Sequence, residues 1–438
     1  MSTLKFTHGP HWDRIQDHLT STDGERFAFA FTRPLGDGVN GPILEVLDVA
    51  LIPDHDVEHD GSGWCLSATA LDRVHNQALR SHTGLAEFHN HRLGPPGFSA
   101  TDEDALAPMA SYVVDLLSGL PYVAGVWAQN QMHAEWWRRN RDGALTRGSL
   151  DAVAATGDQL RVLNTGAVAE ERITRQLPLL GRAGQGTVAG LRVAVVGAGG
   201  TGSQVLLNLA YLGFRSIVVL DDDTVETTNL NRLVTAGADD VGIAKTEVAR
   251  RRLHAIDPRI AVTALPGLTV DGEHPELSEV DLIIGCLDHD GPRHRLNQIA
   301  IDTATPYLDI ATGVDDRSTP PAVGGRVILV RPGGPCLMCL GELDTAEVSR
   351  WAKPAAQQRL DREHGYGAGI PDASVVHLNA LTASAAITEV VSWISGSRAP
   401  ADWLDIDLQG SGSGPGTQIG PRRVPPADAN CVACGRRS

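Results

Sequence analysis

One stretch of the sequence constrains the fold more than any other. Residues 191–203 read Leu-Arg-Val-Ala-Val-Val-Gly-Ala-Gly-Gly-Thr-Gly-Ser, a short apolar run that ends in a glycine-rich turn. A helical pattern through Leu212 and a second apolar run at residues 217–220 follow. A strand, a glycine-rich turn, a helix and a second strand in this order form a βαβ unit. The sequence therefore predicts an α/β domain with a parallel, doubly wound sheet.

The glycines of this turn suit a nucleotide. Gly197, Gly199, Gly200 and Gly202 permit a tight turn and a close backbone approach, so that phosphates can lie at the helix N-terminus. Asp221, at the end of the second strand, suits a ribose hydroxyl. Alone, this pattern is weak and would favour a dinucleotide-binding dehydrogenase.

The residues that follow favour an adenylating enzyme over a dehydrogenase. Asp223, Asn229, Arg232 and Lys245 come in order, and Asp288 follows a third apolar run at 280–285. Attack of a carboxylate on the α-phosphate of ATP develops negative charge, which Arg and Lys stabilise. A carboxylate beyond the carboxyl end of a parallel strand is placed to hold Mg²⁺.

Together these motifs resemble the ThiF/MoeB and ubiquitin-activating-enzyme family over about residues 168–438. The resemblance implies that Asp221 binds the ribose of ATP and that Asp288 binds Mg²⁺. It also implies that Asn229, Arg232 and Lys245 contact the phosphates. One departure is Leu233, where Gln often follows the Asn-Leu-x-Arg motif.

An upstream element implies a dimer. Residues 172–176 read Arg-Ile-Thr-Arg-Gln and resemble the N-terminal Arg-x-x-Arg-Gln element of that family. In homodimeric members the second arginine, here Arg175, reaches into the nucleotide site of the partner subunit. The alternative is that Arg175 is an exposed surface charge.

Four of the six cysteines form two Cys-x-x-Cys pairs, Cys336 with Cys339 and Cys431 with Cys434. Four thiolates suit a closed, structural zinc site that ties the C-terminal tail to the domain; a redox disulfide in either pair is the alternative. Thioester-forming relatives carry a cysteine after the first zinc pair, and the sequence between the two pairs has none. Since Cys286 suits strand-end packing and Cys65 precedes this domain, we expect adenylation without a catalytic cysteine.

A second constellation lies near the N-terminus: His89, His91, Ser99 and Asp102, in the pattern His-x-His-x7-Ser-x2-Asp. Histidines two residues apart on a strand face the same side, so both can bind one zinc ion. Asp102 can supply a third ligand and leave the fourth position for a water, whose pKa zinc lowers toward neutrality. Ser99 can hydrogen-bond the developing oxyanion.

This array resembles the JAMM (MPN-plus) metalloprotease family, which includes isopeptidases acting at ubiquitin-like C-termini, over roughly residues 1–150. In that family an upstream glutamate is the general base; Glu25 matches its position, with Glu45 as the competitor and Glu87 as a structural residue. Asn90 departs from the family, which usually has Ser or Thr between the two histidines, and Arg92 stands where Pro is common.

The organisation expected from these motifs is a metalloprotease domain at 1–150, a linker at 151–166 and an adenylating domain at 167–438. The net charge of −16 argues against nucleic-acid binding through overall charge. The sequence shows neither a signal-peptide pattern nor an apolar run long enough for a membrane span, so we expect a cytoplasmic protein.

The two sites suggest one shared substrate, a ubiquitin-like protein whose C-terminus is trimmed and then adenylated. The first interpretation is bacterial ubiquitin-like modification, alongside a conjugating enzyme. The second is the same chemistry on a sulfur-carrier protein in cofactor or natural-product biosynthesis. The third is a non-catalytic scaffold that binds a ubiquitin-like partner. Zinc at one catalytic and one structural site, ATP and Mg²⁺ are the cofactors expected for the first two.

Overall fold

The computed structural model divides the chain into two compact units, Met1–Ala167 and Val168–Ser438. Each unit is described by itself. The structure describes residues 2–7, 10–21, 24–38, 40–59, 64–91, 97–129, 131–157, 159–163, 171–270, 272–315, 321–353, 374–408 and 416–435.

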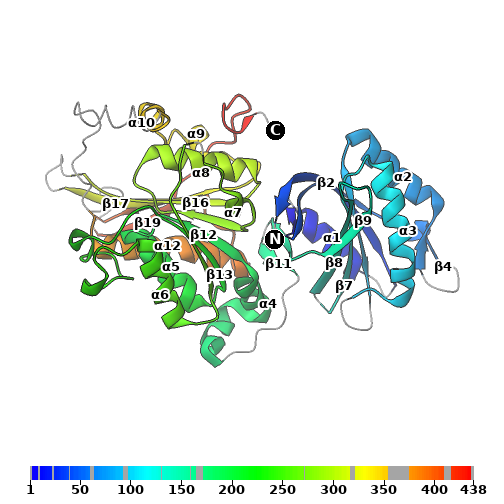
Figure 1. Cartoon of the computed structure of the whole chain (residues 1–438), viewed down its shortest axis with the longest axis horizontal. Helices are drawn as coiled ribbons and strands as arrows, with labels where there is room; N and C mark the ends of the chain where they lie inside the picture. The colour runs from blue at the N-terminus through cyan, green and yellow to red at the C-terminus, as the bar shows by residue number, and fades with distance from the viewer. Residues whose placement is uncertain are drawn as a thin grey trace. The chain divides into compact units, whose positions relative to one another are not determined.

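The first unit is built on a large mixed sheet with helices on both faces (Figure 1). Its strands follow the order β11-β10-β1-β3-β2-β6-β7-β8-β9, and a separate two-stranded sheet pairs β4 with β5. The elements in chain order are β1 Thr3–Phe6, α1 His11–Thr20, β2 Phe27–Gly38, β3 Gly41–Leu51, η1 Asp54–Asp56, β4 Val57–His59, β5 Trp64–Leu66, α2 Ala68–Ser81, β6 Gly84–Asn90, α3 Ala100–Leu116, β7 Tyr122–Ala128, β8 Gln131–Arg139, β9 Leu145–Ser149, β10 Ala152–Thr156 and β11 Leu160–Val162.

Two apolar cores cover the two faces of this sheet. Helix α1 buries Trp12, Ile15 and Leu19 on one face, where they join aromatic residues of the central strands. Helices α2 and α3 pack on the other face, over the alternating phenylalanines of β2. The sequence predicted this alternation, because residues two apart on a strand share a face.

Residues 151–163 correct the predicted linker. Strand β10 (Ala152–Thr156) is buried throughout and pairs in parallel with β1, and β11 (Leu160–Val162) pairs with β10. The Ala- and Thr-rich composition of this stretch is typical of a linker. Small side chains, however, also fit a buried strand such as β10. The first unit thus extends beyond residue 150, and residues 164–166 of the predicted linker lie outside the described residues.

The second unit contains the predicted parallel sheet. Its strands follow the order β14-β13-β12-β15-β16-β17-β18-β19; the first five are parallel, and β16 to β19 are antiparallel. The elements are η2 Glu171–Gln176, α4 Leu177–Gly190, β12 Arg192–Val196, α5 Gly200–Leu212, β13 Ser216–Leu220, η3 Thr227–Asn229, η4 Ala238–Asp240, α6 Lys245–Ile256, β14 Ala261–Leu265, α7 Pro275–Ser278, β15 Leu282–Gly285, α8 Asp290–Asp302, β16 Tyr307–Asp315, β17 Ala322–Val330, α9 Leu337–Leu340, α10 Thr345–Trp351, α12 Val376–Ser395, β18 Trp403–Asp407 and β19 Gln418–Pro421.

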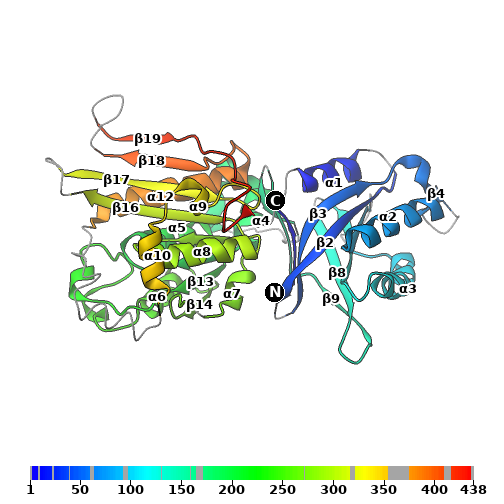
Figure 2. The ribbon, with the colours of Figure 1, turned by 90° about the horizontal axis from the view of Figure 1, so that it is seen from above.

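Helices cover both faces of this second sheet. Figure 1 shows α8 on one face and α5 and α12 on the other, and Figure 2 shows β17, β18 and β19 following β16 in order toward one edge. The central strands are buried on both faces because helices cover them, which explains their continuous apolar sequence. The prediction of a Rossmann-like α/β fold is therefore confirmed, with an antiparallel extension that the sequence motifs did not reveal.

No helix in the described parts of the chain combines the length and the apolar character needed to cross a membrane.

Candidate active sites

The glycine-rich turn joins β12 to α5 at the carboxyl end of the parallel strands. Gly197 has a φ of +91°, in the region that favours glycine. A Cβ atom on Gly202 would lie 1.8 Å from the carbonyl oxygen of Gly197, so only glycine lets α5 begin this close to the strand. The turn is further fixed by Asp221, whose carboxylate accepts a hydrogen bond of 2.7 Å from the backbone N–H of Ala198.

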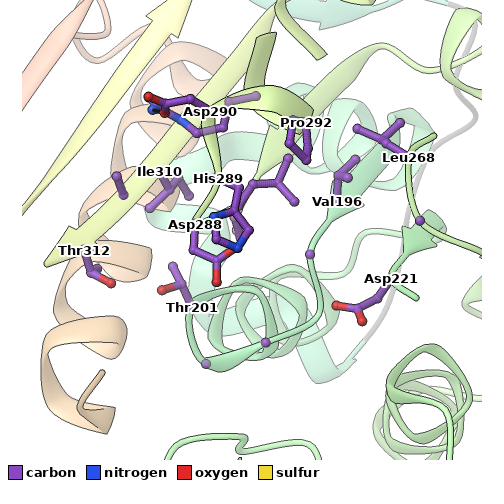
Figure 3. Close-up of a pocket in the computed structure, with 18 of the residues that line it drawn as sticks. Val196, Thr201, Asp221, Leu268, Asp288, His289, Asp290, Pro292, Ile310 and Thr312 are labelled. Atoms are coloured by element: carbon purple, nitrogen blue, oxygen red, sulfur yellow. Dashed lines mark hydrogen bonds and ion pairs between the residues drawn. The ribbon is translucent and has the colours of Figure 1, made fainter. Parts of the chain in front are cut away.

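A large polar cavity of about 1270 Å³ opens beside this turn (Figure 3). Its lining includes all of the predicted nucleotide-site residues except Gly202, Asn229 and Arg175. In Figure 3, Thr201, Asp288 and Thr312 lie toward one side of the cavity, and Asp221 lies toward the other. Ligands of open α/β sheets bind at this place, outside the carboxyl ends of the strands.

Two of the cationic side chains that line the cavity, Lys245 and Arg232, were predicted as phosphate contacts. The Lys245 ammonium lies 2.6 Å from the carboxylate of Asp223. The Arg232 guanidinium donates to the carbonyl oxygen of Thr228 at 2.7 Å and to the side chain of Asn231 at 3.0 Å. Both cationic side chains therefore reach the cavity while they contact groups on its rim. An anionic ligand in the cavity could replace those partners.

Acidic side chains lie in the same cavity. Burial raises the pKa of Asp221, against the opposing effects of the charge on Lys245 and hydrogen bonds from backbone N–H groups. Asp288 is different, because its carboxylate is 78% exposed and follows the end of β15. An exposed carboxylate at this position has oxygen atoms available to a hard cation such as Mg²⁺.

Two predicted side chains, those of Asn229 and Arg175, lie away from the cavity lining. The side chain of Asn229 accepts a hydrogen bond of 3.1 Å from the backbone N–H of Glu226 and so stabilises its own short loop. Arg175 is exposed on η2. The neighbouring Arg172 instead fastens η2 to the unit, through hydrogen bonds to Asp257 at 3.0 Å and to the carbonyl oxygen of Ala210 at 3.2 Å.

The four cysteines of the two Cys-x-x-Cys pairs meet in space, although 95 positions separate the paired partners. Neighbouring Sγ atoms lie 3.4–3.8 Å apart, close to the roughly 3.8 Å edge of a tetrahedron with zinc–sulfur bonds of about 2.3 Å. Burial favours the neutral thiol of Cys431, but hydrogen bonds from the backbone N–H groups of Cys434 and Ala433 lower its pKa to about 7. The donor set therefore fits a closed, structural zinc site.

The first unit brings His89, His91 and Asp102 together, as the sequence predicts. The two Nε2 atoms lie 3.2 Å apart, and the carboxylate oxygens of Asp102 lie 3.5 Å from His89 and 3.2 Å from His91. Zinc with bonds of about 2.0–2.1 Å would require ligand separations of roughly 3.3–3.4 Å, so this donor set fits the ion.

The local structure holds Asp102 in place. Ser99 caps helix α3: its hydroxyl oxygen accepts from the backbone N–H of Asp102, and its own backbone N–H donates to the Asp102 carboxylate at 2.6 Å. Burial tends to raise the pKa of Asp102, but hydrogen bonds from His89 and Ser99 outweigh it and hold the pKa well below its usual value. Since the Ser99 oxygen accepts in this cap, its O–H remains a donor for a ligand.

Glu25 was predicted as the general base, Glu45 as its alternative and Glu87 as a structural residue. Burial raises the pKa of Glu25, while the charges on His89 and His91 oppose that rise, which places Glu25 near both histidines. Glu45 is 2% exposed and bonded to Thr7 and Arg33 at 2.8 and 2.5 Å. Glu87 accepts from the Tyr122 hydroxyl at 2.8 Å, and burial raises its pKa. The partners of Glu45 and Glu87 suit structural roles, and Glu25 is the candidate base.

Comparison with known proteins bears on the second unit. Residues 172–408, just over half of the chain, match the ThiF family. The chain belongs to the ThiF family. The matched range contains the glycine-rich turn, Arg232, Lys245, Asp288 and the first cysteine pair.

Curated relatives agree with this assignment. The SAMP-activating enzyme E1 of Haloferax volcanii is 30% identical over 181 residues, which is 41% of this chain and 64% of that protein. The sulfur carrier protein adenylyltransferase of Thermus thermophilus is 35% identical over 173 residues, covering 39% of this chain and 63% of that protein. This chain thus spans slightly less than two thirds of either relative. A crystal structure of Escherichia coli MccB has 20% identity and a TM-score of 0.47, covering 61% of this chain and 75% of MccB.

Within the ThiF region, sequence reasoning missed two buried residues beside the cavity. Asn379 of α12 is fully buried, and its side-chain oxygen lies 3.3 Å from the hydroxyl of Thr201 and 3.2 Å from that of Thr312. Arg293 of α8 lines the cavity and donates to the buried Asp309 at 2.6 and 3.1 Å. No motif marks either residue, and nothing in the sequence links position 379 to the glycine-rich turn.

Proposed function

We propose that the second unit uses ATP and Mg²⁺ to adenylate the C-terminal carboxylate of a ubiquitin-like or sulfur-carrier protein. The observation that carries this proposal is the cavity, which gathers the glycine-rich turn, Arg232, Lys245 and Asp288. The names of two relatives, a SAMP-activating enzyme and a sulfur carrier protein adenylyltransferase, support this chemistry.

Each residue has a distinct task in this proposal. The N-terminus of α5 binds phosphate through its backbone N–H groups, and Asp221 accepts hydrogen bonds from the ribose. Arg232 and Lys245 stabilise negative charge as the carboxylate attacks the α-phosphate and pyrophosphate leaves. Asp288 would hold Mg²⁺, which neutralises phosphate charge when bound. Asp223 and Asn229 support the loop that carries these groups.

We further propose that the second unit forms a homodimer in which Arg175 contacts the nucleotide site of a second copy. Its exposure on η2, while Arg172 is fastened to the body of the unit, is compatible with that role.

The adenylate would form without a dedicated catalytic cysteine. Desolvation and the charge on Asp309 raise the pKa of the Cys286 thiol well above its usual value. A thiol of high pKa supplies little thiolate at neutral pH, and the thiolate is the nucleophile in thioester chemistry. The activated carboxylate would therefore pass directly to a partner: a sulfur donor, or the thiol of a conjugating enzyme.

For the first unit we propose a zinc metallopeptidase of JAMM type that cuts at the C-terminus of the same carrier protein. The donor set of His89, His91 and Asp102 carries this proposal. Zinc bound there would act as a Lewis acid and lower the pKa of a water. Glu25 would accept the proton of that water and pass it to the leaving amine, and Ser99 would donate a hydrogen bond to the oxyanion.

Both activities would then act on one carrier C-terminus: trimming would free the carboxylate that adenylation activates. Ubiquitin-like modification and sulfur transfer share these two steps and differ only in the acceptor. The test combines purified full-length chain, a candidate carrier with a C-terminal extension, ATP and labelled pyrophosphate. Trimming is followed by intact mass, and adenylation by ATP–pyrophosphate exchange.

The expected result is zinc-dependent removal of the extension, followed by exchange that requires the trimmed carrier. Trimming that persists in His89→Ala and in chelator would refute the peptidase. Exchange that does not require Asp288 would refute the proposed Mg²⁺ site. Binding of the carrier with neither activity would support the scaffold interpretation, in which the chain only binds its partner.

A further inference from the structure

Asn90 lies between the two zinc-ligand histidines but faces the other side of the sheet. It ends strand β6, and since side chains alternate along a strand, it points away from His89. The residue is 7% exposed. A buried amide needs partners, because a buried polar group left without a hydrogen bond destabilises the fold.

Those partners lie on either side of Glu25. The backbone N–H of Arg26 donates to Oδ1 of Asn90 at 2.6 Å, and Nδ2 of Asn90 donates to the carbonyl oxygen of Gly24 at 3.3 Å. One side-chain amide therefore binds the main chain directly before and directly after Glu25. We call these two hydrogen bonds the Asn90 clamp.

The sheet shows why such a clamp is useful. The antiparallel pairing of β2 with β6 ends at Phe27 and His89. Continuing this register would place Arg26 opposite Asn90 and Glu25 opposite His91. The side chain of Asn90 thus supplies hydrogen bonds where the backbone pairing stops, at the residue that must face the zinc ligands.

The side chain of Arg26 makes further contacts, with residues of η1 and α1. Its guanidinium lies 2.8 Å from the carboxylate of Asp54 and 3.3 Å from Nδ1 of His18. Arg26 is therefore held through both its backbone and its side chain. The segment that carries Glu25 is fixed at Arg26 by α1 and η1, and at Gly24 by Asn90.

We propose that Asn90 is a positioning residue that holds Glu25 toward the zinc site through its hydrogen bonds to Gly24 and Arg26. The inference rests on the proposed peptidase function of the first unit. It also accounts for the departure from the family's Ser or Thr, because a hydroxyl carries one polar atom where the amide carries two. A general base must lie within about 2.6–3.2 Å of the atom that carries the proton it accepts, so loss of the clamp should affect catalysis more than binding.

The test uses Asn90→Ala, Asn90→Thr and Asn90→Asp in the full-length, zinc-loaded chain. For Asn90→Ala we expect the kcat of trimming to fall about 10–100-fold, with KM changed less than about threefold and two zinc ions per chain retained. Asn90→Asp keeps the acceptor for the backbone N–H of Arg26 but places an oxygen, which cannot donate, beside the Gly24 carbonyl. Its kcat should therefore lie between those of wild type and Asn90→Ala. Asn90→Thr should resemble Asn90→Ala.

A matched control separates positioning from stability. Thr156 on β10 donates a buried hydrogen bond of 3.1 Å to the carbonyl oxygen of Phe6 in the same sheet. Thr156→Val should therefore lower Tm as Asn90→Ala does but leave kcat unchanged. If Asn90 acts through Glu25, adding Asn90→Ala to Glu25→Gln should cause no further loss of kcat.

Two outcomes would overturn the positioning role: an unchanged kcat in Asn90→Ala, or the same fold-loss in the Glu25→Gln background. If the wild-type chain trims no carrier, the peptidase proposal fails, and amide hydrogen exchange at Arg26 decides the remaining question. Faster exchange in Asn90→Ala than in Thr156→Val supports the clamp, and equal exchange refutes it.

Discussion

The ammonium group of Lys245 lies 2.6 Å from the carboxylate of Asp223 at the rim of the cavity beside the glycine-rich turn. The two partners differ in exposure, since the lysine side chain is 11% exposed and the aspartate 70%. Water screens an ion pair with so exposed a partner, and such pairs contribute only about 0–1 kcal/mol. Lys245 can therefore exchange Asp223 for a phosphate at little cost.

We expect Lys245→Ala to lower ATP–pyrophosphate exchange by about 100-fold or more, because it removes a charge that stabilises the transition state. Asp223→Ala should change the rate less than about fivefold. Arg250→Ala is the control, since it removes a cation of the same helix that pairs with the nearby Glu247 instead. An equal loss of exchange rate in Arg250→Ala would show that the net charge of the helix, rather than the position of Lys245, determines the rate.

The glycine-rich turn, the histidine pair and each Cys-x-x-Cys pair could be predicted because each depends on local spacing. Gly197 and Gly202 satisfy a steric demand of the turn itself, and His89 and His91 share a face whatever the rest of the fold. Asn379 could not be predicted in the same way. Its partners Thr201 and Thr312 come from a helix and a strand far away in sequence, and only the packing of α12 brings them together.

The end of the first domain was predicted too early, at residue 150, for a related reason. The run Ala-Val-Ala-Ala-Thr of β10 carries little hydrophobic signal of its own, and its place in the sheet is decided by parallel pairing with β1, about 150 residues earlier. Parallel partners leave no hairpin signal in the sequence, because they are not joined by a short turn.

The cysteine cluster should behave as a structural zinc site. Cys431→Ser is expected to lower the zinc content by one ion per chain and to lower the Tm of the second unit, because the tail would lose its link to Cys336. Metal analysis and calorimetry measure both effects. Cys65→Ser, in the first unit, is the control and should change neither. Unchanged zinc content in Cys431→Ser would contradict the site.

Asn379 should matter for nucleotide binding. Its amide packs against the turn so closely that a Cβ on Gly200 would lie 2.3 Å from Nδ2. We expect Asn379→Ala to raise the KM for ATP about 10-fold, because Thr201 loses the partner that orients it beside the phosphate site. Thr382→Val, a polar deletion on the same buried helix, is the control. Equal KM values in the two variants would contradict the prediction.

Asp257 should make the stability of the second unit depend on pH. Hydrogen bonds from Arg259, together with the charges on Arg259 and Arg172, lower its pKa to about 2 against the opposing effect of burial. A depressed native pKa contributes stability above the unfolded value of about 3.9, and this contribution is lost as the pH falls toward 2. We therefore expect Asp257→Asn to destabilise the unit by about 1–3 kcal/mol at pH 7, and by progressively less between pH 4 and pH 2.

Denaturant unfolding of wild type and Asp257→Asn at pH 7, 5 and 3 measures this difference. Glu247→Gln is the matched control, because Glu247 also binds an arginine but in an exposed pair on α6, where screening leaves a small effect at every pH. Because Arg172 ties η2 to the unit through Asp257, hydrogen exchange in residues 171–176 should also rise in Asp257→Asn and not in Glu247→Gln. A destabilisation of equal size at pH 7 and pH 3 would show that the ionised carboxylate is not its source.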